Sequence, residues 1–124
     1  MISLLELFSE KELKTLYHVT TSETAQEIEN RGFNPKNVID YKYYSQLGKD
    51  GIYFYDNLRQ SQTYAYFLKS KNPNKSLSLI TVKVPETSIS KSNKIEDGVF
   101  VSTDKLNDVK IISIKPINKI GSMY

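Results

Sequence analysis

The order of β-forming and helical stretches most constrains the fold of this chain. Aromatic and β-branched residues cluster in short runs bounded by Gly, Pro, Asn or Asp, a pattern typical of strands. Five such runs are present, at residues 16–20, 52–55, 77–84, 99–102 and 109–114. Helical spacing is concentrated early and strands late. This segregation predicts an α+β fold with a mainly antiparallel or split sheet.

Apolar spacing and capping residues predict the helices. Residues 3–16 carry a rough helical stripe with a capping box at Ser9 and Glu12, so residues 1–14 are interpreted as an N-terminal helical segment. A second helix is expected through residue 31, with Ala25 and Ile28 buried and Gly32 just beyond its end. A third is expected through about residue 68. The expected N-caps are Thr21 or Ser22 for the second helix and Asp56 or Asn57 for the third.

Length and composition limit the classes of protein to be considered. A chain of 124 residues fits a single domain covering residues 1–124. The absence of cysteine and the single histidine argue against disulfides, thiolate sites and His-rich metal sites. No apolar run is long enough to span a membrane, and the first residues do not read as a signal peptide. We therefore expect a cytoplasmic protein, monomeric by default, with no metal and no membrane partner.

The net charge of +3 is unevenly distributed. Residues 1–62 carry 7 Lys or Arg and 9 Asp or Glu, whereas residues 63–124 carry 10 and 5. Lys69, Lys71 and Lys75 form a basic segment after the third helix. This asymmetry fits an anionic partner for the C-terminal half, and it equally fits a solvated Lys-rich surface.

Two motifs carry candidate chemistry. The first is Leu16-Tyr17-His18-Val19-Thr20-Thr21, followed by a helix and then Gly32-Phe33. The second begins at Gly48 and reads Gly-Lys-Asp-Gly-Ile-Tyr-Phe-Tyr-Asp, with Ser61 eight residues and Tyr64 eleven residues after Tyr53. Each residue alone is weak evidence for a functional site, because a lone histidine on a strand or a tyrosine in an alternating strand more often has a structural role. Their joint order and spacing make the pattern specific.

These motifs resemble the catalytic domain of poly(ADP-ribose) polymerases and their relatives, the His-Tyr-Glu type of ADP-ribosyltransferases. The similarity covers residues 16–64 and implies the family's split, mainly antiparallel sheet with two or three helices. It also implies NAD as co-substrate. His18 would hydrogen-bond the 2′-hydroxyl of the adenosine ribose, and Tyr53 and Tyr64 would sandwich the nicotinamide ring. Ser61 would donate a hydrogen bond to the carboxamide oxygen.

The resemblance also assigns roles to the two residues that follow His18. The backbone of Val19 would complete carboxamide recognition, although the family usually has glycine there. Thr20 stands where the family has serine, and is placed with the NAD-binding residues. A binding role for the loop that contains Tyr41, Tyr43 and Tyr44 is weaker, because these rings also suit a simple cover for the core.

The resemblance does not determine which residue supplies the catalytic carboxylate. Side-chain type favours Glu96, and an ungapped count back from Leu106 favours Asp97. Neighbours on a strand face opposite sides, so both cannot point into one cleft. A third register places Val99 at the position and leaves no carboxylate. A solvated acidic turn is the alternative interpretation of this stretch.

The resemblance predicts a mono-ADP-ribosyltransferase that releases nicotinamide from NAD and transfers ADP-ribose to a protein or nucleic-acid acceptor. A toxin or phage effector is the expected context, by analogy of fold alone. The alternatives are an NAD glycohydrolase and a module that binds NAD or ADP-ribose without turnover. Removal of an RNA 2′-phosphate is disfavoured, because that reaction depends on several basic cleft residues and the chain's only arginines are Arg31 and Arg59.

Overall fold

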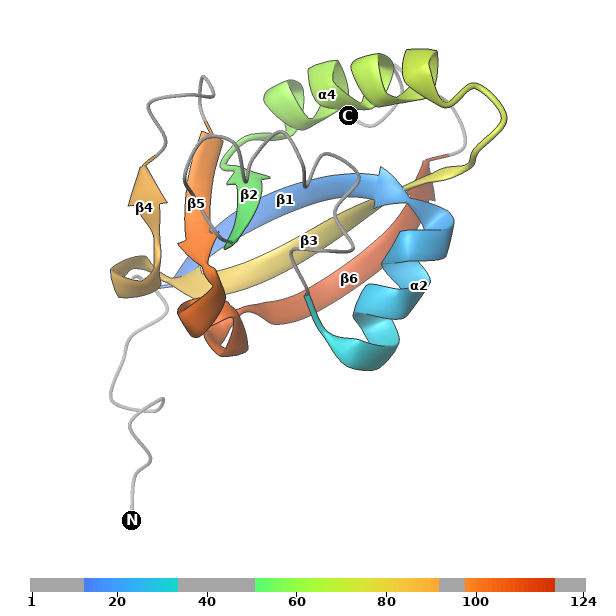
Figure 1. Cartoon of the computed structure of the whole chain (residues 1–124). Helices are drawn as coiled ribbons and strands as arrows, with labels where there is room; N and C mark the ends of the chain where they lie inside the picture. The colour runs from blue at the N-terminus through green and yellow to red at the C-terminus, as the bar shows by residue number, and fades with distance from the viewer. Residues whose placement is uncertain (1–12, 34–50, 92–97, 118–124) are drawn as a thin grey trace.

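The computed structural model describes residues 13–33, 51–91 and 98–117, which form a six-stranded sheet with two α-helices (Figure 1). Every registered strand pair is antiparallel, and the strand order is β4-β5-β2-β1-β3-β6. The strands are β1 (Leu13–Thr21), β2 (Gly51–Tyr55), β3 (Leu77–Pro85), β4 (Ser90–Lys91), β5 (Gly98–Ser102) and β6 (Lys110–Ile117). The helices are α2 (Ser22–Arg31) and α4 (Leu58–Lys71), with short 3-10 segments at Glu86–Ser88 and Thr103–Asp108. The predicted α+β class with an antiparallel sheet is confirmed.

The sheet is nearly divided between β1 and β2. β1 pairs with β3 along its whole length, from Leu13↔Pro85 to Thr21↔Leu77. On its other edge β1 is in register with β2 at a single pair, Tyr17↔Tyr55. β2 pairs in full with β5. The described strands therefore form two half-sheets, and in Figure 1 β1, β3 and β6 run across the picture while β2, β4 and β5 stand nearly upright.

The two helices cover opposite faces of the β1–β3 half-sheet (Figure 1). Ala25 and Ile28 of α2 pack into a core with Leu16 of β1 and the alternating residues of β3, Ile80, Val82 and Val84. Ala65 and Leu68 of α4 pack with Val19 and Leu77 in a second cluster. Because side chains alternate along a strand, Leu16, His18 and Thr20 belong to the α2 face of β1, and Val19 belongs to the α4 face.

The helix ends match the sequence signals. The side chain of Thr21 accepts a hydrogen bond from the Thr24 backbone N–H, and that of Asn57 accepts one from Gln60. Thr21 and Asn57 are thus the caps among the alternatives predicted. Gly32 has φ +79° and donates its backbone N–H to the carbonyl of Ile28, as a residue beyond a helix end does. α4 continues to Lys71, three residues past the predicted end.

Two predicted boundaries are wrong. β1 begins at Leu13, so residues 13–16 are strand and not the end of an N-terminal helix. The long ladder that β1 forms with β3 outweighs the apolar helical spacing of residues 3–16. The rest of the predicted N-terminal helix, residues 1–12, lies outside the described part of the chain. β6 continues through Pro116 to Ile117, beyond the predicted end of the run at residue 114. β6 is the last strand in the sheet order, and an edge strand tolerates a proline because one side of its backbone needs no partner.

Among the described residues, no helix combines the length and the apolar character that crossing a membrane requires.

Candidate functional site

His18 lies at the division of the sheet and is almost fully buried, with 7% of its surface exposed. Its Nδ1 is 3.0 Å from the backbone carbonyl oxygen of Tyr53. A carbonyl oxygen only accepts, so Nδ1 carries the hydrogen and donates. Burial lowers the pKa of His18 from 6.5 to about 4, although this hydrogen bond opposes the shift. At neutral pH the imidazole is therefore uncharged, and Nε2 presents a lone pair.

Two buried polar atoms of β1 have no hydrogen-bond partner within the described residues, the Nε2 of His18 and the Oγ1 of Thr20. Thr20 is 1% exposed. Residues two apart on a strand point to the same face, so both atoms belong to one side of β1. Buried polar groups are nearly always satisfied in folded proteins. The Nε2 of His18 can accept a hydrogen bond, and the hydroxyl of Thr20 can donate or accept one. These two atoms are therefore the strongest indication of a ligand position in the described structure.

Aromatic rings hold the imidazole in place. The centroid of the Phe33 ring lies 5.6 Å from that of His18 in an edge-on arrangement, and the Phe54 centroid lies at 5.5 Å. Phe33 and Phe54 also contact each other, with 5.3 Å between centroids. Phe33 directly follows Gly32, so the end of α2 helps to position the histidine. The ring is thus fixed both by packing and by its bond to Tyr53.

The backbone around Val19 lies beside the gap between the half-sheets. Continuing the Tyr17↔Tyr55 register by two residues would place Val19 opposite Tyr53. The ladder stops before that pair, and the imidazole of His18 takes the Tyr53 carbonyl instead. The β1 edge from His18 to Thr21 therefore has no registered strand partner among the described residues on this side. Such an edge can present backbone groups to a bound amide.

Two of the predicted site residues, Ser61 and Tyr64, lie on α4, the helix that contacts both β1 and β2. Ser61 is fully buried, and its hydroxyl donates to the carbonyl of Asn57 at 3.2 Å. In this conformation the Ser61 oxygen offers a lone pair, and the hydroxyl must rotate before it can donate to a ligand. Tyr64 is half-buried, with its ring centroid 5.8 Å from that of Tyr55. Tyr53 is 6% exposed, on the strand that α4 also contacts.

Tyr55 is a residue that the sequence interpretation missed. It shares a face of β2 with Tyr53, because the two are separated by one residue. Its contact with Tyr64 places a further aromatic ring beside the predicted stacking residue. The alternation of Tyr53 and Tyr55 was the available sequence signal.

Other candidates lie outside the described residues or in the core. Glu96, Asp97, Tyr41, Tyr43 and Tyr44 fall in the segments that the structure does not describe. Val99, the third option for the carboxylate position, is 7% exposed and is in register with Phe54.

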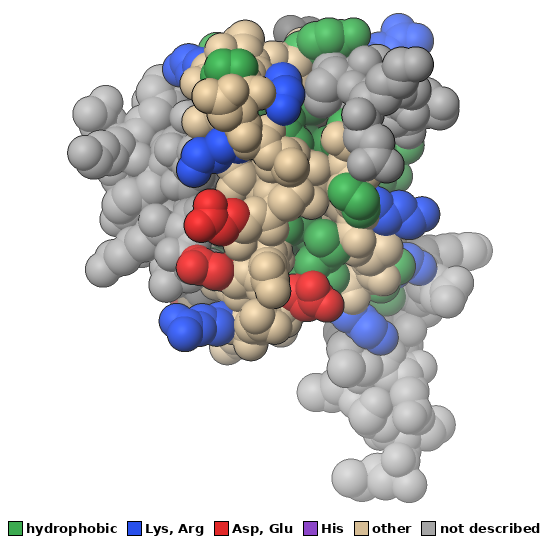
Figure 2. Space-filling model, turned by 90° about the vertical axis from the view of Figure 1, so that its right-hand side faces the viewer, with side chains coloured by type: hydrophobic (Ala, Val, Ile, Leu, Met, Phe, Trp, Pro, Cys, Tyr) green, Lys and Arg blue, Asp and Glu red, His purple; other side chains and the backbone are tan. Residues whose placement is uncertain are grey.

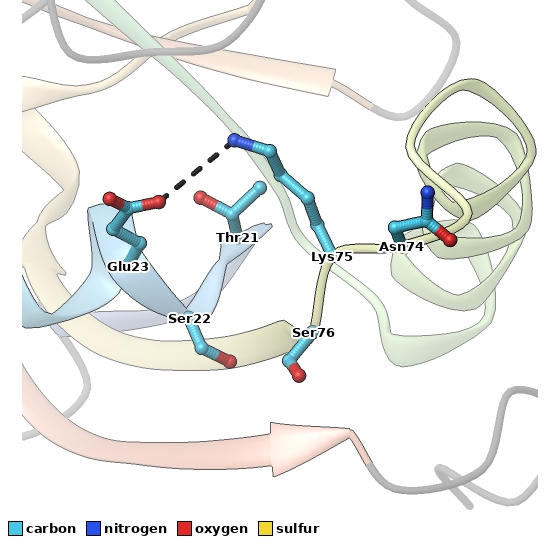
Figure 3. Close-up of a pocket in the computed structure, with 6 residues that line it drawn as sticks. All are labelled: Thr21, Ser22, Glu23, Asn74, Lys75 and Ser76. Atoms are coloured by element: carbon cyan, nitrogen blue, oxygen red, sulfur yellow. Dashed lines mark ion pairs between the residues drawn. The ribbon is translucent and has the colours of Figure 1, made fainter.

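Two pockets lined by described residues adjoin β1, and of the positions predicted for the site only Val99 lines one of them. One, of about 420 Å³, lies where β1 passes into α2 (Figure 3). It is lined by Thr21, Ser22, Glu23, Asn74, Lys75 and Ser76, and a Lys75–Glu23 ion pair of 3.9 Å spans it.

The other pocket, of about 200 Å³, is lined by Lys14, Leu16, Asp56, Glu86, Ile89 and Val99. It brings two carboxylates to the α2 face of β1, and Glu86 lies 3.9 Å from the ammonium of Lys14. Within the described residues, no cluster of three or more His, Asp or Glu side chains is arranged to hold a metal ion.

No protein-family model, curated protein or solved structure matches this chain. The interpretation of the site therefore depends on its residues and their geometry.

Proposed function

We propose that this protein binds NAD at the division between β1 and β2 and acts as a mono-ADP-ribosyltransferase. The observation that carries the proposal is the buried, neutral imidazole of His18, whose Nδ1 is engaged by Tyr53 and whose Nε2 has no partner in the described structure. A ribose hydroxyl is a donor of the kind that this acceptor requires. The family resemblance of residues 16–64 assigns the same contact to His18.

The surrounding residues suit the nicotinamide end of the ligand. The β1 edge at Val19 offers backbone groups to the carboxamide, and Thr20 adds an unpartnered hydroxyl. Tyr53 and Tyr64 supply aromatic faces from β2 and α4. The nicotinamide ring of NAD is a flat cation, which aromatic faces attract. Ser61 would complete the carboxamide contacts after rotation of its hydroxyl.

The neutral state of His18 also suits the reaction. Departure of nicotinamide from NAD leaves a ribose with oxocarbenium character, as in glycoside hydrolysis. A protonated imidazole nearby would repel both the pyridinium and this cation, whereas the depressed pKa keeps His18 uncharged. A carboxylate stabilises such a cation, and Glu96 or Asp97 is proposed for this role. ADP-ribose then passes to a protein or nucleic-acid acceptor.

The test combines NAD binding with nicotinamide release. Binding is measured by calorimetry, and release by NAD labelled in the nicotinamide ring. We expect Thr20→Val to weaken NAD binding about fivefold or more, the effect of one lost hydrogen bond of about 1 kcal/mol. The matched control is Thr15→Val, the same change at an exposed position of β1. Tyr64→Ala should also weaken binding, whereas Tyr66→Ala, an exposed tyrosine of the same helix, should not.

The carboxylates separate binding from turnover. Glu96→Gln or Asp97→Asn should abolish release while NAD still binds. Release that survives both changes would contradict the proposed mechanism. Release without transfer of label to any macromolecule would identify a glycohydrolase, and binding without release would identify a binding module. A wild-type protein that does not bind NAD at all would overturn the proposal.

A further inference from the structure

The outward face of α4 is unusual in composition. Its exposed residues are Arg59, Thr63, Tyr66, Phe67, Ser70 and Lys71. Spacings of three and four residues place them on one side of the helix, opposite the buried Ser61, Ala65 and Leu68. We call this side the outward face of α4. Polar and charged residues make up most of this outward face, as is usual for an amphipathic helix, but it also carries the two large rings of Tyr66 and Phe67.

The two outward rings are well exposed. Tyr66 is 55% exposed and Phe67 47%, and the remaining large exposed hydrophobic residue in the described structure is Ile112 on β6. Two adjacent aromatic side chains thus share one helix face, whereas isolated exposed apolar residues are common and need no explanation. This pair of exposed rings is the feature of the surface that points to a binding partner.

The charge of this surface is positive. α4 contains Arg59 near its start, Lys69 and Lys71 in its last turn, and no Asp or Glu. The Lys71 ammonium lies 4.5 Å from the centroid of the Phe67 ring. Toward the top of Figure 2, at the height of α4 in Figure 1, Lys and Arg side chains are in view and Asp and Glu side chains are not.

The outward face connects with the proposed NAD site. The Phe67 ring centroid is 6.1 Å from that of Tyr64, which in turn contacts Tyr55. A row of aromatic rings therefore runs from β2 to the outer surface of α4. A flat group bound on Phe67 would lie next to the residue proposed to stack on nicotinamide.

We propose that the outward face of α4 binds single-stranded nucleic acid, with bases stacked on Tyr66 and Phe67 and phosphates at Arg59 and Lys71. Aromatic side chains interleaved with cations are the standard means of holding unpaired strands. Paired bases do not expose their faces, so a duplex should bind less well. A membrane-binding face needs a broad apolar stripe, which Thr63 and Ser70 interrupt. The bound strand is then the ADP-ribose acceptor: a nucleophilic nitrogen or oxygen of a base bonds to C1′ of the nicotinamide ribose as the bond from C1′ to nicotinamide breaks. Nicotinamide leaves as the neutral molecule, the acceptor's proton passes to solvent, and this last step alone rests on the proposed function.

The test uses the full chain without NAD. Binding of fluorescein-labelled single-stranded DNA and RNA of mixed sequence is followed by anisotropy at several salt concentrations. We expect Tyr66→Ala and Phe67→Ala each to weaken binding by about fivefold or more, the effect of losing one base stack. Arg59→Gln with Lys71→Gln should make the slope of log affinity against log salt shallower by about 1.4, or about 0.7 for each phosphate contact.

Matched controls lie on β6. Ile112→Ala removes an equally exposed apolar side chain, and Lys110→Gln with Lys115→Gln removes two exposed charges of the same sign. Neither should change the affinity at the aromatic sites, and the lysine controls should leave the slope nearly unchanged. Equal loss in the α4 and β6 variants would overturn the proposal, because it would indicate diffuse attraction to a basic protein. Tighter binding to phosphatidylserine vesicles than to the oligonucleotides would overturn it in favour of a membrane surface.

The acceptor step is tested separately with NAD labelled in the adenine moiety. Label should appear on the oligonucleotide, and Tyr66→Ala should reduce this transfer without reducing nicotinamide release. Oligonucleotide binding without nicotinamide release would remove the proposed enzymatic function and leave the nucleic-acid surface intact. Release with no oligonucleotide binding would do the reverse.

Discussion

At the scale of single residues, the ionisation of His18 decides what its site can bind. The chain contains one histidine, so its NMR signals need no assignment by mutation. The bond from Nδ1 to the Tyr53 carbonyl selects one tautomer, and burial keeps the ring neutral. We expect the ring nitrogen shifts to show a protonated Nδ1 and an unprotonated Nε2 at pH 7. Addition of NAD should shift the Nε2 signal as it accepts a hydrogen bond.

The same pKa predicts how stability depends on pH. Above about pH 6.5 the imidazole is neutral in both the folded and the unfolded chain, and its contribution is constant. Between pH 6.5 and about 4 the unfolded chain takes up the proton and the folded chain does not. As the pH is lowered from 6.5 to about 4, the free energy of unfolding should therefore decrease, by up to about 3 kcal/mol. Urea unfolding of wild type and His18→Gln isolates the contribution of the imidazole, because the variant has no titratable side chain at this position. Identical pH profiles would contradict the assignment.

At the scale of elements, the end of α2 links helix geometry to the site. Gly32 has φ +79° and ψ 176°, a region that residues with a side chain rarely adopt. A Cβ placed there would meet no atom within 4 Å, so the cost of a substitution comes from the backbone. Phe33 comes next and packs its ring on His18. The glycine thus sets the direction in which this ring enters the core.

Gly32→Ala tests this link. We expect the free energy of unfolding to fall by about 1–3 kcal/mol from backbone strain alone. NAD affinity should fall as well, because Phe33 would shift against His18. Thermal unfolding and calorimetry measure the two effects, with Asn30→Ala, an exposed position of the same helix, as control. A Gly32→Ala protein as stable as the control would show that the chain avoids the positive φ.

At the scale of the whole molecule, the described strands form two half-sheets, which share one registered pair between β1 and β2 and the hydrogen bond from His18. The β1–β3 ladder is continuous, whereas β1 and β2 meet at Tyr17↔Tyr55. The bond from His18 to Tyr53 adds a side-chain link across the gap. Leu16 of β1 and Phe54 of β2 belong to one hydrophobic core, so side-chain packing also joins the two halves. Because β1–β2 has the shortest registered ladder among the described strand pairs, we expect its backbone to open more readily than that of β1 and β3.

Hydrogen exchange can locate that opening. We expect the amides of β1 and β3 that pair with each other to exchange slowest, and those of β2 and β5 to exchange faster. NAD bound at the junction should slow exchange on both sides of it, since the ligand would contact β1 and β2 together. Mass spectrometry of peptic fragments with and without NAD measures this. Protection confined to α2 or β6 would place the ligand elsewhere.

The elements of the fold were largely predictable from the sequence because their signals are local. β-branched and aromatic runs located every described strand except the two-residue β4, which was not predicted. Thr21, Asn57 and Gly32 marked helix ends through bonds to residues three or four positions away. The failures came where distant partners decide. β1 starts early because β3 pairs with its first residues, and β6 passes Pro116 because it is an edge strand.

For the candidate site, the sequence by itself determined which residue types occur in which order, from His18 to Tyr64. Only the tertiary structure decided the burial, protonation and hydrogen bonding of these residues. Burial among Phe33, Phe54 and the Tyr53 carbonyl makes His18 a neutral acceptor, and the early end of the β1–β2 ladder opens the edge beside it. Neither the desolvation of His18 nor the divergence of the two strands can be derived from sequence spacing. Both depend on groups that the fold brings together from distant parts of the chain.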